Sequence, residues 1–199
     1  YQGEMAFKLS HGADALLEKM ENVSFVTDPE RSSVVEDWQE MVIDDADSYL
    51  TSIREKQLPL DEACAYTHMA YYLRWCVEHD LVSEEFLRRQ QDIVNRLRQT
   101  PEAVNLRAFL REELSGMLLL PLFSEDGQAF TLYYYDWEEP SYLSDLRQYA
   151  LSALSSELPA AEDARREAYL FLPCSEETYR AVAALIEARW NDWAELGDA

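Results

Sequence analysis

The sequence predicts a mainly α protein of the α+β type, built as a helical bundle around a buried central helix at residues 61–79, with a small β element near the C-terminus. Three observations support this prediction. The chain has only 5 Gly and 7 Pro in 199 residues, whereas large β folds with many tight turns need more of both. Hydrophobic residues make up 48% of the chain, which is enough for a sizeable core. The segment 61–79 is apolar on nearly all sides, which is typical of a helix at the centre of a bundle.

The chain is expected to consist of an N-terminal helical arm, residues 1–43, and a helical domain, residues 44–199. A length of 199 residues suits one domain with such an arm. Met5 is a candidate start residue, in which case residues 1–4 are a cloning remnant.

Apolar residues at helical spacing predict helices through the first half of the chain. The clearest helix begins at Asp61, a residue type that caps helix N-termini, and Glu62 complements the positive end of the helix dipole. Ser83 is expected to cap the next helix, and Pro101 suits the first position of the one after it, which is expected to stop at Gly116. Helices are therefore expected at residues 12–22, 30–42, 44–56, 61–79, 83–99 and 100–114.

The second half of the chain mixes helical and strand patterns. Residues 117–123 fit a short strand or a buried connection, and residues 124–135 fit either a strand or a helix. The short apolar run at 167–173 is the best strand, and it is the predicted β element near the C-terminus. Helices are expected at residues 142–155 and 175–195.

Acidity is the strongest compositional signal. Asp and Glu number 39 against 17 Lys and Arg, so the formal net charge is −22. Such a surface repels nucleic-acid phosphates and anionic lipid headgroups, so neither nucleic acid nor membrane is expected as a partner. A basic protein would instead be attracted to it. The alternative is that the charge serves only to keep the protein in solution.

The cysteines and the hydropathy pattern indicate a cytoplasmic protein. Cys64, Cys76 and Cys174 are few, odd in number and without a C-x-x-C pair, which argues for a reducing compartment. The sequence has no window of 18 consecutive apolar residues. Its first residues also lack the basic and apolar regions of a signal peptide.

Candidate chemistry is sparse. Cys64 and His68 are four residues apart, a spacing that places two metal ligands on one helix face, but two ligands do not complete a site. Cys76 and His79 are three apart, which in an apolar helix is more typical of packing than of a catalytic dyad. Nucleophile-elbow and phosphate-loop motifs are missing from the sequence. Catalytic residues, metal ions and cofactors are therefore not predicted.

An acidic aromatic segment, residues 133–142, is the best candidate for a binding surface. Tyr and Trp anchor protein interfaces, and acids between them can meet Lys or Arg of a partner. The alternative is that about half of these rings belong to the core. A second acidic stretch near residue 44 is expected to contribute. The predicted partner-binding residues are Asp136, Trp137, Glu138, Glu139, Tyr142, Asp44, Asp45 and Asp47.

The stretch from His68 to Ser83 resembles a family of uncharacterised bacterial proteins. In that family a helix of the form H-I-G-x-x-L-x-W-x-[IV]-x-x-x-L-[IV]-S recurs, and this chain has Ala70 where the pattern has Gly. Asp44-Asp45-Ala46 precedes it here, and looser matches follow at residues 109–112, 127–130, 134–135, 168–169 and 186–193.

The resemblance implies a function in protein binding. The family looks like immunity proteins of polymorphic or secretion-system toxins, which bind and silence a cognate toxin, and it supplies no catalytic residues to transfer. A basic, nuclease-like toxin is the expected partner, and the oligomeric state stays open. Two rival hypotheses are an adaptor or chaperone for a secreted effector and a hydrolase or metal enzyme built around His68 and Cys64.

Overall fold

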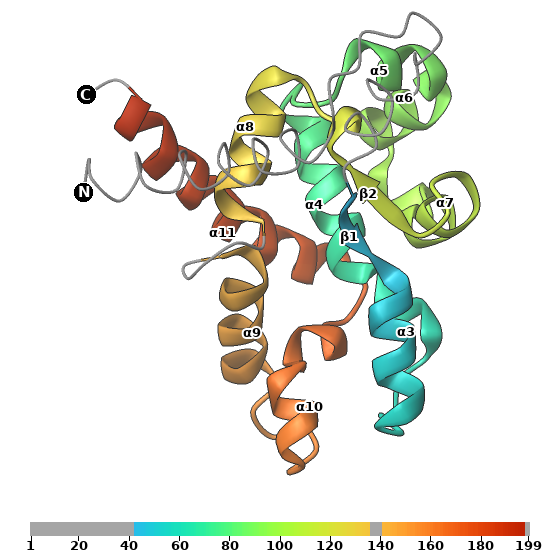
Figure 1. The fold of residues 1–199 in the computed structure, drawn as a ribbon, viewed down its shortest axis with the longest axis vertical. Helices are drawn as coiled ribbons and strands as arrows, with labels where there is room; N and C mark the ends of the chain where they lie inside the picture. The colour runs from blue at the N-terminus through green and yellow to red at the C-terminus, as the bar shows by residue number, and fades with distance from the viewer. Residues whose placement is uncertain (1–41, 136–140, 198–199) are drawn as a thin grey trace, which may run out of the picture.

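The computed structural model describes residues 42–135 and 141–197, which form a mainly helical fold (Figure 1). The strands are β1 (Val42–Asp45) and β2 (Met117–Leu119). The α-helices are α3 (Ala46–Glu55), α4 (Thr67–Glu78), α5 (Glu84–Arg89), α6 (Gln91–Gln99), α7 (Leu106–Glu113), α8 (Glu125–Tyr134), α9 (Tyr142–Ala153), α10 (Glu162–Arg166) and α11 (Glu176–Gly197). Short 3₁₀ helices are η1 (Glu62–Tyr66), η2 (Pro101–Ala103), η3 (Leu120–Leu122) and η4 (Ala168–Phe171). The predicted mainly helical class is confirmed.

Helix α4 lies at the centre of the fold, as predicted. Between Thr67 and Val77 every residue except Arg74 is buried. Helices α6, α7 and α11 pack against α4 (Figure 1). The expected helix at 61–79 is divided, because residues 62–66 form the 3₁₀ turn η1, whose N-cap is Asp61 as predicted. A 3₁₀ turn is common at the N-terminus of an α-helix.

The small sheet joins the start of the described chain to its middle. Strands β1 and β2 are antiparallel, with Asp44 opposite Leu118 and a bulge between Val42 and Asp44. The expectation of a small β element is confirmed, but its predicted position near the C-terminus is wrong. The pairing continues into α3, since the backbone N–H of Ala46 donates to the carbonyl of Gly116.

The run at 167–173, predicted as a strand, instead contains Glu167, the C-cap of α10, and the 3₁₀ helix η4. Ala168 and Leu170 are buried, and η4 packs against helix α9. A strand needs a neighbouring strand to pair its backbone groups, whereas a helical turn pairs them internally. Because the neighbour of this apolar run is a helix and not a strand, the run forms a helical turn and buries its apolar side chains against that helix.

Two other boundaries differ from the sequence prediction, and one ambiguous segment is settled as a helix. The expected helix at 83–99 is split at Gln90 into α5 and α6, although Ser83 is its N-cap as predicted. Pro101 opens only the 3₁₀ turn η2, and α7 begins later, after its N-cap Asn105. The ambiguous segment 124–135 is the helix α8, capped by Ser124.

Some predictions fall outside the described residues. The helix expected at 12–22, all but the last residue of the helix expected at 30–42, and the predicted binding residues 136–139 are among them. Val42, the last residue of that second helix, belongs to β1. None of the helices in the described part of the chain combines the length and the apolar character that a membrane span requires.

Candidate functional site

The sequence-predicted partner-binding residues separate into surface and interior positions. Asp45 and Asp47 lie at the junction of β1 and α3, where Asp45 is half-buried and Asp47 is exposed. Asp44, only 8% exposed, and Tyr142, fully buried, are core residues. Their prediction as surface residues is therefore wrong, because their polar atoms are satisfied inside the protein. Asp136, Trp137, Glu138 and Glu139 lie outside the described residues.

Asp44 is held by four donors. Its Oδ2 accepts from Tyr135 Oη at 2.6 Å and lies 3.0 Å from His68 Nε2. Its Oδ1 accepts from Tyr49 Oη at 2.9 Å and from the backbone N–H of Asp45 at 2.8 Å. Burial alone would raise the pKa of the Asp44 carboxyl, but His68, Tyr135 and Tyr49 stabilise the charged form and hold that pKa below its ordinary value. Asp44 is thus a buried carboxylate that fastens β1 to α3, α4 and α8.

Tyr135 and Tyr142, the tyrosines on either side of residues 136–140, both form hydrogen bonds with residues of this buried cluster. Tyr135 bonds to Asp44, and the hydroxyl of Tyr142 donates to the backbone carbonyl of His68 at 2.7 Å. Their ring centroids are 5.1 Å apart, and both side chains are almost completely buried. The side chains of Tyr135 and Tyr142, on either side of the predicted partner-binding residues 136–139, are therefore both anchored in the core.

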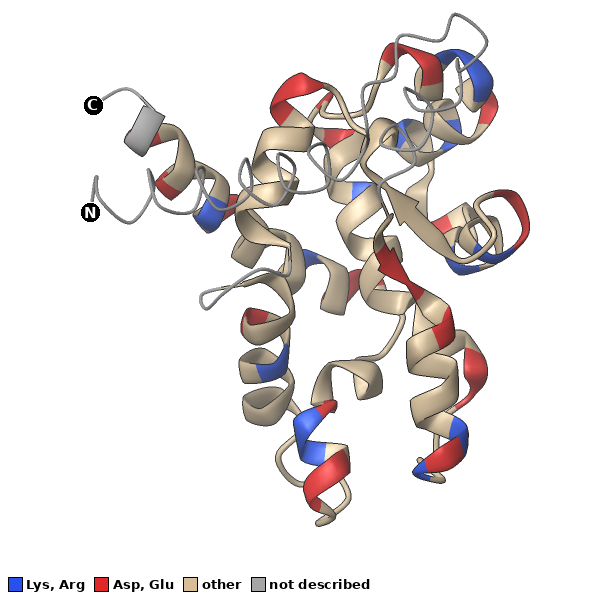
Figure 2. Ribbon diagram, viewed as in Figure 1, with Lys and Arg blue, Asp and Glu red and all other residues tan. Residues whose placement is uncertain are grey.

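The surface next to this cluster is acidic. Asp45 and Asp47 form what we call the acidic junction, at the end of β1 and in the first turn of α3. Oδ1 of Asp45 accepts from the backbone N–H of Asp47 at 2.9 Å and so caps the helix. Figure 2 shows Asp on β1 and on the first turn of α3, with Lys and Arg only near the far end of that helix. Neither junction residue forms an ion pair with a described Lys or Arg.

The interior position of His68 limits its chemistry. It is 1% exposed, and its Nε2 faces Asp44 while Nδ1 lacks a hydrogen-bond partner among the described residues. The rings of Tyr49 and Tyr169 pack edge-on against the imidazole. Cys64 lies in the 3₁₀ turn η1, so it does not share an α-helical face with His68 as the spacing predicted. Within the described residues, no group of three or more His, Cys, Asp and Glu side chains could hold a metal ion.

Cys76 and His79 do not contact each other as a catalytic dyad would: Cys76 is buried in the core, and His79 contacts Trp75 and Glu187. Cys76 is fully buried, and that burial raises the pKa of its thiol far above the ordinary value. His79 stacks on Trp75, and its Nδ1–H donates to the carbonyl of Trp75 at 2.8 Å. Its Nε2 lies 2.9 Å from Glu187. The imidazole is therefore engaged away from the thiol, as the packing interpretation predicted.

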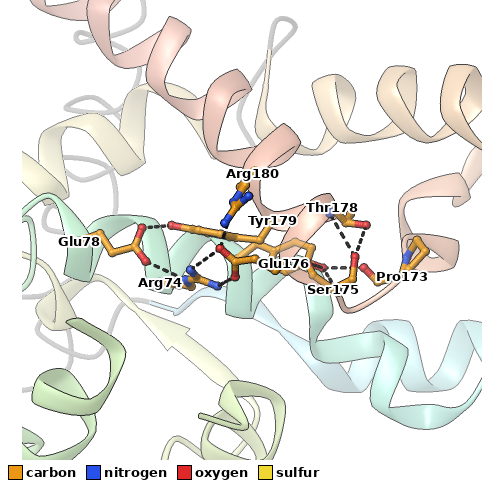
Figure 3. Close-up of polar contacts among 9 residues, drawn as sticks. Arg74, Glu78, Pro173, Ser175, Glu176, Thr178, Tyr179 and Arg180 are labelled. Carbon is orange, nitrogen blue, oxygen red and sulfur yellow. Dashed lines mark hydrogen bonds and ion pairs between the residues drawn. The ribbon is translucent and has the colours of Figure 1, made fainter. Parts of the chain in front are cut away.

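A pocket of about 360 Å³ lies on another part of the molecule, between α4, the η2–α7 connection and the start of α11. On one wall, Arg74 of α4 forms a two-point ion pair with Glu176, with nitrogen–oxygen distances of 2.7 and 3.2 Å, and also pairs with Glu78 (Figure 3). Its guanidinium lies over the Tyr179 ring at 3.6 Å. Arg107 of α7 also lines the pocket. Nothing in the sequence indicated this pocket, because its walls come from three separate segments.

A family model for a domain of unknown function, DUF7832, matches residues 42–161. The chain belongs to the DUF7832 family. The match begins at the first residue of β1 and contains the whole cluster of Asp44, His68, Tyr135 and Tyr142. The α11 wall of the pocket lies beyond the matched part of the DUF7832 domain. Comparisons with curated proteins and with solved structures found no match.

Proposed function

We propose that this DUF7832 protein works by binding another protein, and that it is an immunity-type protein which neutralises a cognate bacterial toxin. The observation that carries the proposal is the bond between Asp44 and Tyr135. It joins Asp44 to Tyr135, and each of these residues directly precedes an acidic stretch that the sequence predicts to bind a partner.

The geometry of the cluster explains why the two stretches would act as one surface. Asp44 is followed directly by the acidic junction of Asp45 and Asp47, while Tyr135 is followed directly by the acidic aromatic segment 136–139. Asp44 and Tyr135, the residues before the two stretches, are joined in the core. An interface that uses aromatic anchors together with steering charges suits a basic protein partner.

The charges on the rest of the described surface also favour a basic partner. Most Lys and Arg side chains of the described residues are already held by Asp or Glu in ion pairs, which leaves the surplus of carboxylates without a counter-charge. These cations are Arg54, Lys56, Arg74, Arg88, Arg89, Arg98, Arg111, Arg166, Arg180 and Arg189. The field of the surplus acids would raise the association rate of a basic protein.

The choice of a toxin as the partner rests on the resemblance stated from the sequence. Co-expression with the product of the adjacent gene tests it. If that product stops growth, this protein should restore it, and the two purified proteins should elute together on size exclusion. A complex without toxicity would favour the adaptor or chaperone hypothesis, and absence of both rescue and complex would overturn the immunity hypothesis.

A further inference from the structure

The pocket between α4, α7 and α11 has the size and lining of a small-molecule site. Its volume of about 360 Å³ lies within the range of ligand pockets, which is about 300–1,000 Å³. Part of its lining is apolar and part is polar. The apolar part includes Ala70, Pro101, Val104 and Leu106, and the polar part includes Asn105 and Ser175.

The two arginines of the pocket differ in how their charge is used. Arg74 is neutralised, since Glu176 and Glu78 both pair with it (Figure 3). Arg107 has neither an ion pair nor a side-chain hydrogen bond with any described residue, and its Nε is buried without a partner.

An arginine left unpaired in a chain with net charge −22 needs a physical reason. A half-buried cation without a counter-ion costs free energy, and an anion in the pocket would remove that cost. One unneutralised guanidinium matches one negative charge. Glu102 and Glu176 also line the pocket, and their charges would repel a dianion such as phosphate more strongly than a monoanion.

We propose that this pocket binds a small organic acid with a single carboxylate, which pairs with Arg107 while its apolar part lies against Val104 and Leu106. The site is independent of the acidic junction. None of its lining residues belongs to β1 or α3.

The test is an NMR titration of the full chain with benzoate, phenylacetate and hexanoate, each compared with its neutral amide and with inorganic phosphate. We expect at least one acid to shift the backbone resonances of Ala70, Val104 and Ser175, and to bind roughly tenfold more tightly than its amide. Phosphate should bind more weakly than that acid. If none of the acids shifts these resonances, or if acid and amide bind equally, the proposal is wrong.

Variants test whether the positive charge that binds the acid is that of Arg107. Arg107→Gln should weaken binding of the acid roughly tenfold, while Arg107→Lys should retain more of it because the charge is kept. Arg165→Gln, which removes an exposed charge on α10 outside the pocket, is the control and should bind like the parent. If Arg165→Gln weakens binding as much as Arg107→Gln, only the net charge matters and the site is not the pocket. The acid–amide comparison on the parent decides the matter even if Arg107→Gln fails to fold.

Discussion

The carboxylate of Asp44 accepts a hydrogen bond of 2.6 Å from the phenol of Tyr135, which lies 91 residues further along the chain. The bond joins β1 to the C-terminal end of α8. Tyr135 belongs to the acidic aromatic segment 133–142, so the same bond anchors part of that segment in the core. The stability of the Asp44 cluster and the proposed binding function are therefore coupled.

Removing the Tyr135 hydroxyl should cost more stability than removing the Tyr142 hydroxyl. Tyr135→Phe deletes a bond to a carboxylate, worth about 1.5–3 kcal/mol, whereas Tyr142→Phe deletes a bond to the neutral carbonyl of His68, worth about 0.5–1.5 kcal/mol. Both rings are almost completely buried, so each variant is the control for the other. The measurement is the free energy of unfolding in urea at pH 7. Equal losses, or a larger loss for Tyr142→Phe, would contradict the assignment of Asp44 as a charged acceptor.

The lowered pKa of Asp44 predicts a stability that depends on pH. A carboxyl whose pKa is lower in the folded than in the unfolded state stabilises the protein above the unfolded pKa, and this contribution is lost as the pH falls through the folded pKa. Asp44→Asn should therefore be less stable than the parent at pH 7, and the difference should shrink below about pH 4. Urea unfolding of both proteins between pH 7 and pH 3 measures it. A difference that stays constant over this range would show that the charge of Asp44 does not contribute.

Gly127 in α8 should not tolerate a methyl group. A Cβ placed there would lie 2.2 Å from the carbonyl oxygen of Leu81 and 3.1 Å from Cβ of Phe123. Gly127→Ala should therefore destabilise the protein by about 1–3 kcal/mol, although Ala favours a helix over Gly by about 1 kcal/mol. The check is the midpoint of thermal unfolding. An unchanged or raised midpoint would mean that α8 does not approach the Leu81 loop so closely.

The fold could be predicted from the sequence where local signals decide it. Apolar spacing placed α4 at the centre, and the capping residues Asp61 and Ser83 marked the starts of η1 and α5. The break at Gln90 carries no Gly or Pro and was missed. Strand β1 was missed because only its partner β2, far along the chain, makes it a strand. The run at 167–173 has strand composition, but its neighbour in space is the helix α9.

The candidate site could be predicted only in part for the same reason. Acid-rich composition identified the acidic junction, which lies at the surface. It could not separate Asp44 from Asp45, because the burial of Asp44 depends on Tyr135, His68 and Tyr49 from three other segments. Arg107 lacks an ion pair among the described residues, and this likewise depends on residues from α4 and the start of α11 that line the same pocket.

In the proposed function, the acidic junction belongs to the protein-binding surface. The most direct measurement is the association rate with the product of the adjacent gene, at low and high salt, for two charge-matched double variants. Asp45→Asn with Asp47→Asn removes the junction charges while Asn keeps the helix cap. Glu84→Gln with Asp92→Asn removes two exposed charges from α5 and α6, which lie far from α3 in Figure 1. We predict that the junction variant associates roughly fivefold more slowly at low salt and depends less on salt, while the control variant stays close to the parent. Equal rates for the two variants, or a junction variant that associates like the parent, would contradict the claim.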